Sequence, residues 1–289
     1  MINSNAFLDL PTEFTAYDRS RYAILPVPYE GTVSYVSGTA GGPMAILEAS
    51  GFVELLDDEL HRECHTAGIH TLPAVHPAPG PDEQMRRVYE AAAPVVRDGK
   101  FLLTLGGEHS ITSPLVRAMC ERHGEVSVLQ IDAHADLRDE LGGTGCSHGA
   151  VMRRVLDITP HLCQVGIRSF SHEELLACPG QVEAFITPRM IRSGGDWIAR
   201  VLERLRGKVY VTIDIDGFDP AYAPGTGTPE PGGLDWFEVT ALLRSVCGER
   251  EVVGADIVEV RPIPGHHVTE FLAAKLAYKI IAYTQGRRA

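Results

Sequence analysis

The sequence lacks the features that mark a secreted, membrane-bound or thiol-based protein. Its cysteines all stand singly, at Cys64, Cys120, Cys146, Cys163, Cys178 and Cys247. Without a CxxC pair, neither a zinc ribbon nor a thioredoxin-like site is indicated. The start of the chain has acidic residues instead of the basic and apolar segments of a signal peptide. No apolar run is long enough to span a bilayer. We therefore expect a cytoplasmic protein with reduced thiols and no membrane partner.

Basic residues are also in the minority. The 26 Lys and Arg residues stand against 38 Asp and Glu, which gives a formal net charge of -12. This charge disfavours nonspecific binding to nucleic acid and mildly favours cationic partners. The chain also has no internal repeat, low-complexity tract or linker that would divide it. We expect a single domain over residues 1–289, with residues 1–20 as an N-terminal arm.

What the sequence does contain is an alternation of short apolar runs with longer amphipathic stretches. The runs expected to form strands are Tyr22–Pro26, Phe101–Leu105, Ser127–Asp132, Leu162–Ile167, Lys208–Asp214 and Val252–Val258. The stretches expected to form helices are Asp82–Arg97, Pro114–His123, Trp197–Leu205, Leu234–Val246 and Glu270–Tyr283. Continuously apolar strands that alternate with helices indicate an α/β fold with a mostly parallel sheet, covered on both faces.

Three of the expected strands end in side chains that bind metals. The side chains that follow these strands are those of His109, of Asp132, His134 and Asp136, and of Asp214 and Asp216. Alternate side chains of an extended chain point to the same side, so the residues of each group can project together. In open α/β sheets the working crevice lies at the carboxyl ends of the strands. Four carboxylates and two imidazoles are therefore expected in one cleft.

This donor set favours a pair of divalent cations. A mononuclear catalytic zinc site commonly uses only three protein ligands. Four clustered carboxylates would also repel one another unless cations neutralised them. Oxygen-rich donors with only two imidazoles suit manganese better than copper or structural zinc. Two such ions can lower the pKa of a shared water to near neutrality, which makes it a nucleophile for hydrolysis.

The same segments resemble the signature blocks of a known family. Gly106-Gly-Glu-His-Ser110, Asp132-Ala-His-Ala-Asp136 and Asp214-Ile-Asp-Gly-Phe-Asp-Pro220 are similar to the three blocks of the ureohydrolases, the arginase and agmatinase family. The resemblance runs from Pro26 to Ala274. It implies a three-layer α/β/α sandwich with a mostly parallel eight-stranded sheet, and assembly as a homo-trimer or homo-hexamer.

The resemblance also implies a role for individual residues. It assigns two Mn²⁺ to each subunit. One ion would be bound by His109, Asp132, Asp136 and Asp214, and the other by Asp132, His134, Asp214 and Asp216. Glu259 matches the carboxylate that grips the substrate guanidinium, and two parallel hydrogen bonds suit that planar cation. His148 matches the histidine that shuttles protons or helps the leaving amine depart.

The residues around these blocks favour agmatine, hydrolysed to putrescine and urea, as the substrate. Arg138 stands where arginase proper has an Asn that recognises the amino-acid end of arginine. Asp139 could attract a cationic amine. Other guanidino compounds stay open: aminopropylagmatine, guanidinobutyrate, arginine, or a carboxylated agmatine derivative that a basic Arg261 would favour. Departures from the family pattern at Val36, Ala40, Arg261 and Gly265 bear on this choice.

Two functions other than that of a ureohydrolase remain as alternatives. A dinuclear phosphoesterase also uses clustered Asp and His. The ligand segments, however, have no Gly-rich phosphate cradle or basic cluster beside them, and Glu259 would repel a phosphate. A catalytically silent scaffold paralogue would be expected to lose ligands, whereas this chain keeps the complete set together with His148 and Glu259.

Overall fold

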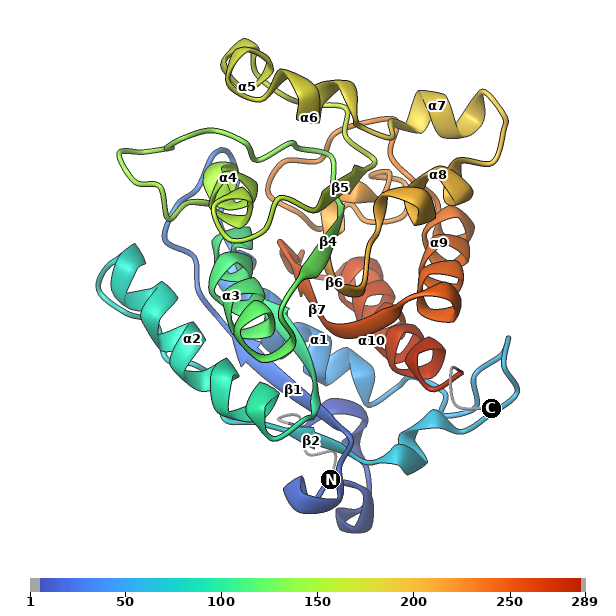
Figure 1. Ribbon diagram of the computed structural model, residues 1–289. Helices are drawn as coiled ribbons and strands as arrows, with labels where there is room; N and C mark the ends of the chain where they lie inside the picture. Colours follow the sequence, from blue (N-terminus) through green and yellow to red (C-terminus); the bar gives the residue numbers. More distant parts are fainter. Residues whose placement is uncertain (1–5, 287–289) are drawn as a thin grey trace.

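A seven-stranded parallel sheet forms the middle of the molecule, which the computed structural model describes over residues 6–286 (Figure 1). Its strands are β1 (Tyr22–Val27), β2 (Ile69–Thr71), β3 (Phe101–Gly106), β4 (Val126–Ile131), β5 (Leu162–Val165), β6 (Lys208–Asp214) and β7 (Glu251–Val258). They lie in the order β2-β1-β3-β7-β6-β4-β5, and every pair is parallel. The predicted α/β class is confirmed.

Helices cover both faces of this sheet and complete three layers (Figure 1). One face packs against α2 (Pro81–Arg97), α3 (Thr112–His123) and α4 (Val151–Leu156). The other packs against α1 (Gly42–Ser50), α8 (Trp197–Arg204), α9 (Trp236–Glu249) and α10 (Val268–Thr284). The remaining helices, near the β5 end of the sheet, are α5 (His172–Ala177), α6 (Pro179–Glu183) and α7 (Pro188–Arg192). The strand interiors are buried because both faces are covered.

The sheet differs from the expected eight strands at its β5 edge. There the chain returns and forms a single parallel bridge between Val165 and Ile186. The amide of Ile186 donates to Gln164, and its carbonyl accepts from Gly166. Pro188 follows two residues later at the start of α7 and has no amide hydrogen with which to continue the ladder. The eighth strand position is therefore occupied by one bridging residue.

Several boundaries also differ from the sequence expectations. β2, α1, α4, α5, α6 and α7 were not predicted, because their runs are short or begin at Gly or Pro. Helix α9 starts at Trp236, after the expected Leu234, because Asp235 and Glu238 form a capping box. In the arm, Phe7 and Leu8 are buried in the core. Residues 1–5 of the predicted arm and 287–289 of the predicted domain lie outside the described residues.

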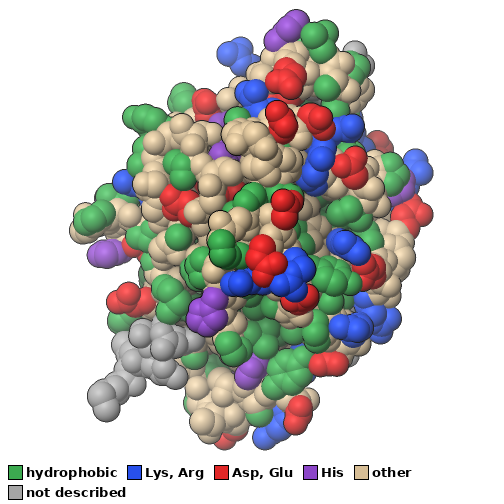
Figure 2. Space-filling view, turned by 90° about the vertical axis from the view of Figure 1, so that its left-hand side faces the viewer, with side chains coloured by type: hydrophobic (Ala, Val, Ile, Leu, Met, Phe, Trp, Pro, Cys, Tyr) green, Lys and Arg blue, Asp and Glu red, His purple; other side chains and the backbone are tan. Residues whose placement is uncertain are grey.

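The described part of the molecule has no membrane-spanning helix, and the face shown in Figure 2 has mixed charges. No helix within residues 6–286 combines the length and apolarity that crossing a bilayer requires. Figure 2 views the molecule from its left-hand side in Figure 1, and shows acidic and basic side chains intermingled over that face. Ion pairs along α2, such as Arg86 with Glu83 and Glu90, are of this kind. Exposed pairs of this type contribute little to stability.

Candidate metal centre

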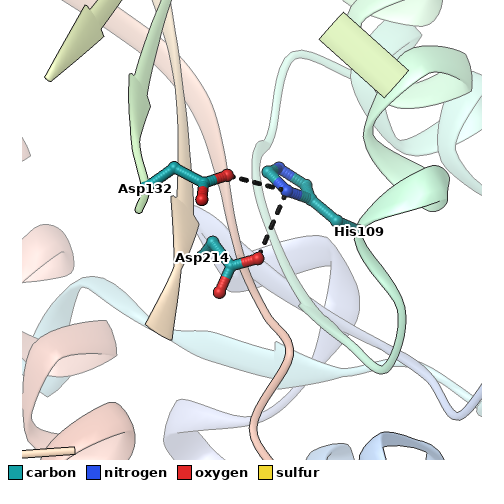
Figure 3. A group of neighbouring side chains, drawn as sticks. All are labelled: His109, Asp132 and Asp214. Atoms are coloured by element: carbon teal, nitrogen blue, oxygen red, sulfur yellow. Dashed lines mark ion pairs between the residues drawn. The ribbon is translucent and has the colours of Figure 1, made fainter. Parts of the chain in front are cut away.

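The metal-binding side chains predicted from the sequence meet at the carboxyl ends of neighbouring strands. Asp132 follows β4 directly, Asp214 is the last residue of β6, and His109 lies in a short 3-10 helix after β3 (Figure 3). Because β3, β7, β6 and β4 are adjacent and parallel, their ends open into one crevice. The predicted convergence of these residues is therefore present in the structure.

The turn after β3 is shaped by the close approach of another loop. The backbone amide of Glu108 donates to the carbonyl of Tyr29 at 2.8 Å. A Cβ on Gly107 would stand only 2.2 Å from that carbonyl oxygen, so only glycine fits here. This packing brings the loop around Gly31 and Thr32 against the crevice.

His109 lies at the centre of the cluster. Its Nδ1 atom is 3.2 Å from Asp132 Oδ2, 3.2 Å from Asp136 Oδ2 and 3.5 Å from Asp214 Oδ2. The imidazole is fully buried. A second group surrounds His134, whose Nδ1 lies 3.0 Å from Asp216 Oδ2 and 3.7 Å from Asp132 Oδ1.

The two groups fit a pair of cations, with Asp132 common to both. Within one set, candidate ligand atoms of His109, Asp132 and Asp214 lie within 4.8 Å of one another. The same limit holds for Asp132, His134 and Asp216. Asp136 faces His109 in the first group. This geometry gives Asp132 one oxygen toward each imidazole.

The hydrogen bonding of His109 is what a metal ligand requires. Its Nε2 atom lies 2.8 Å from the Thr212 hydroxyl, which donates its own hydrogen to Asp256 at 2.6 Å. Nε2 must therefore carry the proton, so Nδ1 of the neutral ring has a free lone pair. Nδ1 is buried and has no hydrogen-bond partner. A buried unpartnered nitrogen facing three carboxylates fits a cation ligand.

The pKa values of the clustered side chains also indicate that the cluster needs positive charge. Burial, together with the charges of Asp136 and Asp216, raises the pKa of Asp132 to about 7. Burial and the same kind of repulsion raise the pKa of Asp214 well above its ordinary value. Burial opposes protonation of His134, but Asp216 outweighs it and raises the pKa to about 11. Without cations, the cluster thus retains protons to limit its own repulsion.

Two candidate residues adopt a backbone conformation that side chains other than glycine rarely take. Asp136 has φ of 54° and Glu259 has φ of 61°. Such left-handed residues cost on the order of 1 kcal/mol or more and cluster at functional sites. Both side chains line the same cavity.

Glu259 is fixed above the cluster. Its Oε1 atom accepts the backbone amide of His109 at 2.8 Å, and its own amide donates to Gly107 at 2.7 Å. Burial raises the pKa of the Glu259 carboxyl well above its usual range, against the lowering effect of the His109 amide. A planar cation could supply the positive charge that this carboxylate lacks.

His148 is held by hydroxyl groups from the loop that follows β1. The Thr32 hydroxyl donates to Glu108 at 2.8 Å and lies 2.7 Å from His148 Nδ1. Nδ1 must therefore be the protonated nitrogen of a neutral His148. Its Nε2 atom lies 2.7 Å from the Ser34 hydroxyl and carries the lone pair. His148 can thus accept or release a proton at Nε2.

A cavity of about 280 Å³ connects these groups with the solvent. Its polar wall includes His134, Asp136, Arg138, His148, Asp214 and Glu259. Apolar side chains of Val33, Tyr35, Val36, Leu141 and Phe170 also line it. Those of Val33, Tyr35 and Phe170 are exposed and therefore mark its mouth. A ligand with a polar head and an aliphatic chain matches this distribution.

Not all of the predicted specificity residues reach this cavity. Arg138 lines it and pairs with Glu173 at 3.6 Å. Asp139 is not among the lining residues, and its carboxylate pairs with Arg154 at 2.9 Å. Arg261 is likewise absent from the wall, because its Nε donates to the carbonyl of Ser37 at 2.9 Å. Arg261 therefore stabilises the loop that contains Ser37 and does not face the cavity.

The sequence reasoning missed several side chains that support the site. Gln130 and Thr212 each stand two positions before a predicted ligand, Asp132 and Asp214. A residue at that offset points to the same side of a strand as the ligand. Polar residues inside otherwise apolar strands were therefore the signal that could have revealed them. Thr32, by contrast, carries no such signal in the sequence.

Comparisons with known proteins show the family of this chain. A model of the arginase family matches residues 20–282. The chain is 39% identical to N(1)-aminopropylagmatine ureohydrolase from Synechocystis sp., over 98% of this chain and 97% of the relative. It is 34% identical to agmatinase from Bacillus anthracis, over 87% of both chains.

Among solved structures, the agmatine ureohydrolase of Thermoplasma volcanium superposes with a TM-score of 0.87 and 31% identity. That match covers 98% of this chain and 94% of the other. The family model, the similar relatives and the solved structure agree on one family. The chain belongs to the arginase family and is a hydrolase of the ureohydrolase type.

Proposed function

We propose that this protein uses two Mn²⁺ ions to hydrolyse N(1)-aminopropylagmatine, releasing urea and a triamine. The observation that carries the metal part is the buried, unpartnered Nδ1 of His109, faced by three carboxylates. The predicted ligands are His109, Asp132, Asp136 and Asp214 for one ion. Those for the other are Asp132, His134, Asp214 and Asp216. Manganese suits this oxygen-rich set.

The cations would supply Lewis acidity and a water whose pKa is lowered to near neutrality. The protein groups do the rest. Glu259, fixed by the amide of His109, accepts hydrogen bonds from the guanidinium and orients its central carbon over the cluster. His148 Nε2 can deliver a proton to the departing nitrogen or move one to solvent. Water thus adds to the guanidinium carbon, the carbon–nitrogen bond to the chain breaks, and urea and a protonated amine leave.

The choice of substrate is supported by the relatives and by the cavity. Agmatine is the main expectation from the sequence, but the relative named for aminopropylagmatine is more similar than the one named agmatinase. The apolar mouth suits a long methylene chain. Glu30 also lines the cavity. Arg138 is the single Arg or Lys side chain that lines it within residues 6–286, and Arg138 pairs with Glu173. Agmatine is the second candidate.

A substrate panel tests this proposal. With Mn²⁺ added, we expect kcat/KM for aminopropylagmatine to exceed that for agmatine by about tenfold, or about 1.4 kcal/mol, because the added propylamine contacts the cavity mouth. Urea release would be measured for both, and for arginine and guanidinobutyrate as controls. A higher kcat/KM for agmatine would favour agmatine, and equal values would contradict a preference for aminopropylagmatine. Preference for a carboxylated substrate, or phosphatase activity without urea, would overturn the proposal.

The protons held by the cluster predict how cation binding depends on pH. The pKa of Asp132 is raised to about 7 without cations. A carboxyl with a raised folded-state pKa stabilises the fold at low pH, and that contribution is lost as pH rises through the folded pKa. Cation binding requires the ionised carboxylate, so cations stabilise the fold more strongly at higher pH. The increase in Tm caused by Mn²⁺ should therefore grow from about pH 6 to about pH 8. Calorimetric scans would check it; an increase that shrinks over this range would contradict it.

Assembly, domain organisation and location belong to the same proposal. We propose one ureohydrolase domain over residues 1–289 that acts in the cytoplasm as a homo-trimer or homo-hexamer. An exposed apolar surface that includes Tyr222, Val268 and Phe271 supports contact between subunits. Light scattering on the purified protein would give the subunit number.

A further inference from the structure

Buried polar side chains form a row across the sheet, directly below the candidate metal centre. They stand in register on adjacent strands, in the order Thr104, Asp256, Thr212, Gln130 and Gln164. All of them are fully buried among apolar neighbours. Burying polar groups in a sheet is costly unless each has a hydrogen-bond partner. The partners of these side chains therefore indicate what the row does.

Two of the five members, Asp256 and Thr212, fix the protonated nitrogen of His109. Two others, Gln130 and Gln164, are glutamines and lead to a different candidate ligand. Gln181 in α6 donates to Gln164 Oε1 at 3.0 Å, and Gln164 donates to Gln130 Oε1 at 2.5 Å. Gln130 Nε2 donates to Asp132 Oδ2 at 2.6 Å. We call Gln181, Gln164 and Gln130 the glutamine relay.

The direction of the relay is determined by its surroundings. The Gln130 amide nitrogen also lies 3.3 Å from the carbonyl of His134, and that of Gln164 lies 2.8 Å from the carbonyl of Ala135. Turning either amide over would place a carbonyl oxygen against these acceptors. For Gln130 it would also place one against the Asp132 carboxylate. The relay therefore presents a hydrogen-bond donor to Asp132 in one orientation only.

A glutamine suits this position better than a charged residue. An acid would repel Asp132, and a lysine would compete with a cation for it. The neutral amide donates without changing the charge of the cluster. The His134 amide holds the other oxygen, Oδ1, at 2.6 Å, so both oxygens of Asp132 are oriented.

We propose that Gln130, held in turn by Gln164 and Gln181, is a positioning residue that fixes the Asp132 carboxylate for cation binding. The proposal rests on the proposed cation site but not on the substrate. It places part of the metal affinity outside the cluster, in a chain of amides that begins in α6. Partners behind metal ligands typically contribute about 10–100-fold to metal affinity.

The test uses Gln→Met variants, which keep the side-chain shape and remove the amide. Mn²⁺ affinity of the cation-free protein would be measured by calorimetry, without substrate. Gln130→Met should weaken Mn²⁺ binding by about 10–100-fold. Gln164→Met should weaken it less, because Gln130 still contacts Asp132. Adding Gln164→Met to Gln130→Met should cost almost nothing more, since coupled residues are not additive.

Gln84 provides the matched control, because it is a fully buried glutamine in α2 that bonds the amide of Ala78. Gln84→Met should leave Mn²⁺ affinity unchanged even if it lowers Tm. If Gln130→Met does not fold, Mn²⁺ affinity is measured on Gln181→Met, because Gln181 is only half-buried. An unchanged affinity in Gln181→Met would then overturn the relay. Wild-type affinity in Gln130→Met, or additive losses in the double variant, would also overturn it. Failure of the wild-type protein to bind Mn²⁺ would instead reject the cation site.

Discussion

Asp132→Asn should lower urea release by at least about 10³-fold and reduce the bound manganese, because the carboxylate common to both groups loses its charge. Asp132 faces His109 with one oxygen and His134 with the other. The amide keeps the size of the side chain but presents a nitrogen where an oxygen ligand is required. Metal content by mass spectrometry and urea release at saturating Mn²⁺ would be measured together.

Asp157→Asn is a suitable control for this variant, since Asp157 is exposed at the end of α4 and pairs only with Arg154 at 3.4 Å among the described residues. It should retain full activity and metal content. An Asp132→Asn protein with wild-type turnover and two bound ions would show that Asp132 does not bridge. The same experiment on Asp214 would test the second predicted bridge, because its Oδ2 faces His109 while Oδ1 accepts the amide of Asp216.

Glu259→Gln should lower kcat/KM by about 30- to 5,000-fold, equivalent to the 2–5 kcal/mol lost when one partner of a buried charge pair is removed. Glu259 stands beside the cation cluster without belonging to either candidate group of metal ligands. Its carboxylate is fixed by the His109 amide, so its orientation is prepared before substrate binds. The loss should appear mainly in KM if Glu259 binds the guanidinium equally in substrate and transition state.

The amount of bound Mn²⁺ distinguishes the Glu259→Gln variant from the Asp132→Asn variant. Glu259→Gln should keep both Mn²⁺ ions and the Tm increase they cause, whereas Asp132→Asn should not. The removed charge should also abolish the discrimination between a guanidinium substrate and a neutral urea analogue tested as an inhibitor. Loss of the metal from Glu259→Gln would show that this residue supports the cluster and that the guanidinium binds elsewhere.

The sequence alone predicted the candidate ligand set and determined the class of the fold. Asp132, His134 and Asp136, like Asp214 and Asp216, alternate at the ends of apolar runs, and alternation along an extended chain is a local property. The same local pattern gave the parallel α/β architecture, since strands without a polar face must be covered on both sides. The resemblance then connected these residues with Glu259 and His148 and with the family confirmed by comparison.

Only the tertiary structure decided which distant residues support the site. The contact of His148 with Thr32 spans 116 positions, and that of Gln164 with Gln130 depends on the register between β4 and β5. Asp139 likewise lies outside the cavity wall and pairs with Arg154, 15 positions along the chain. Strand order, register and loop packing arise from contacts between segments far apart in the chain, and each is selected by the whole core. Local patterns in the sequence therefore predict the candidate ligands, whereas the fold supplies the side chains that hold them in position.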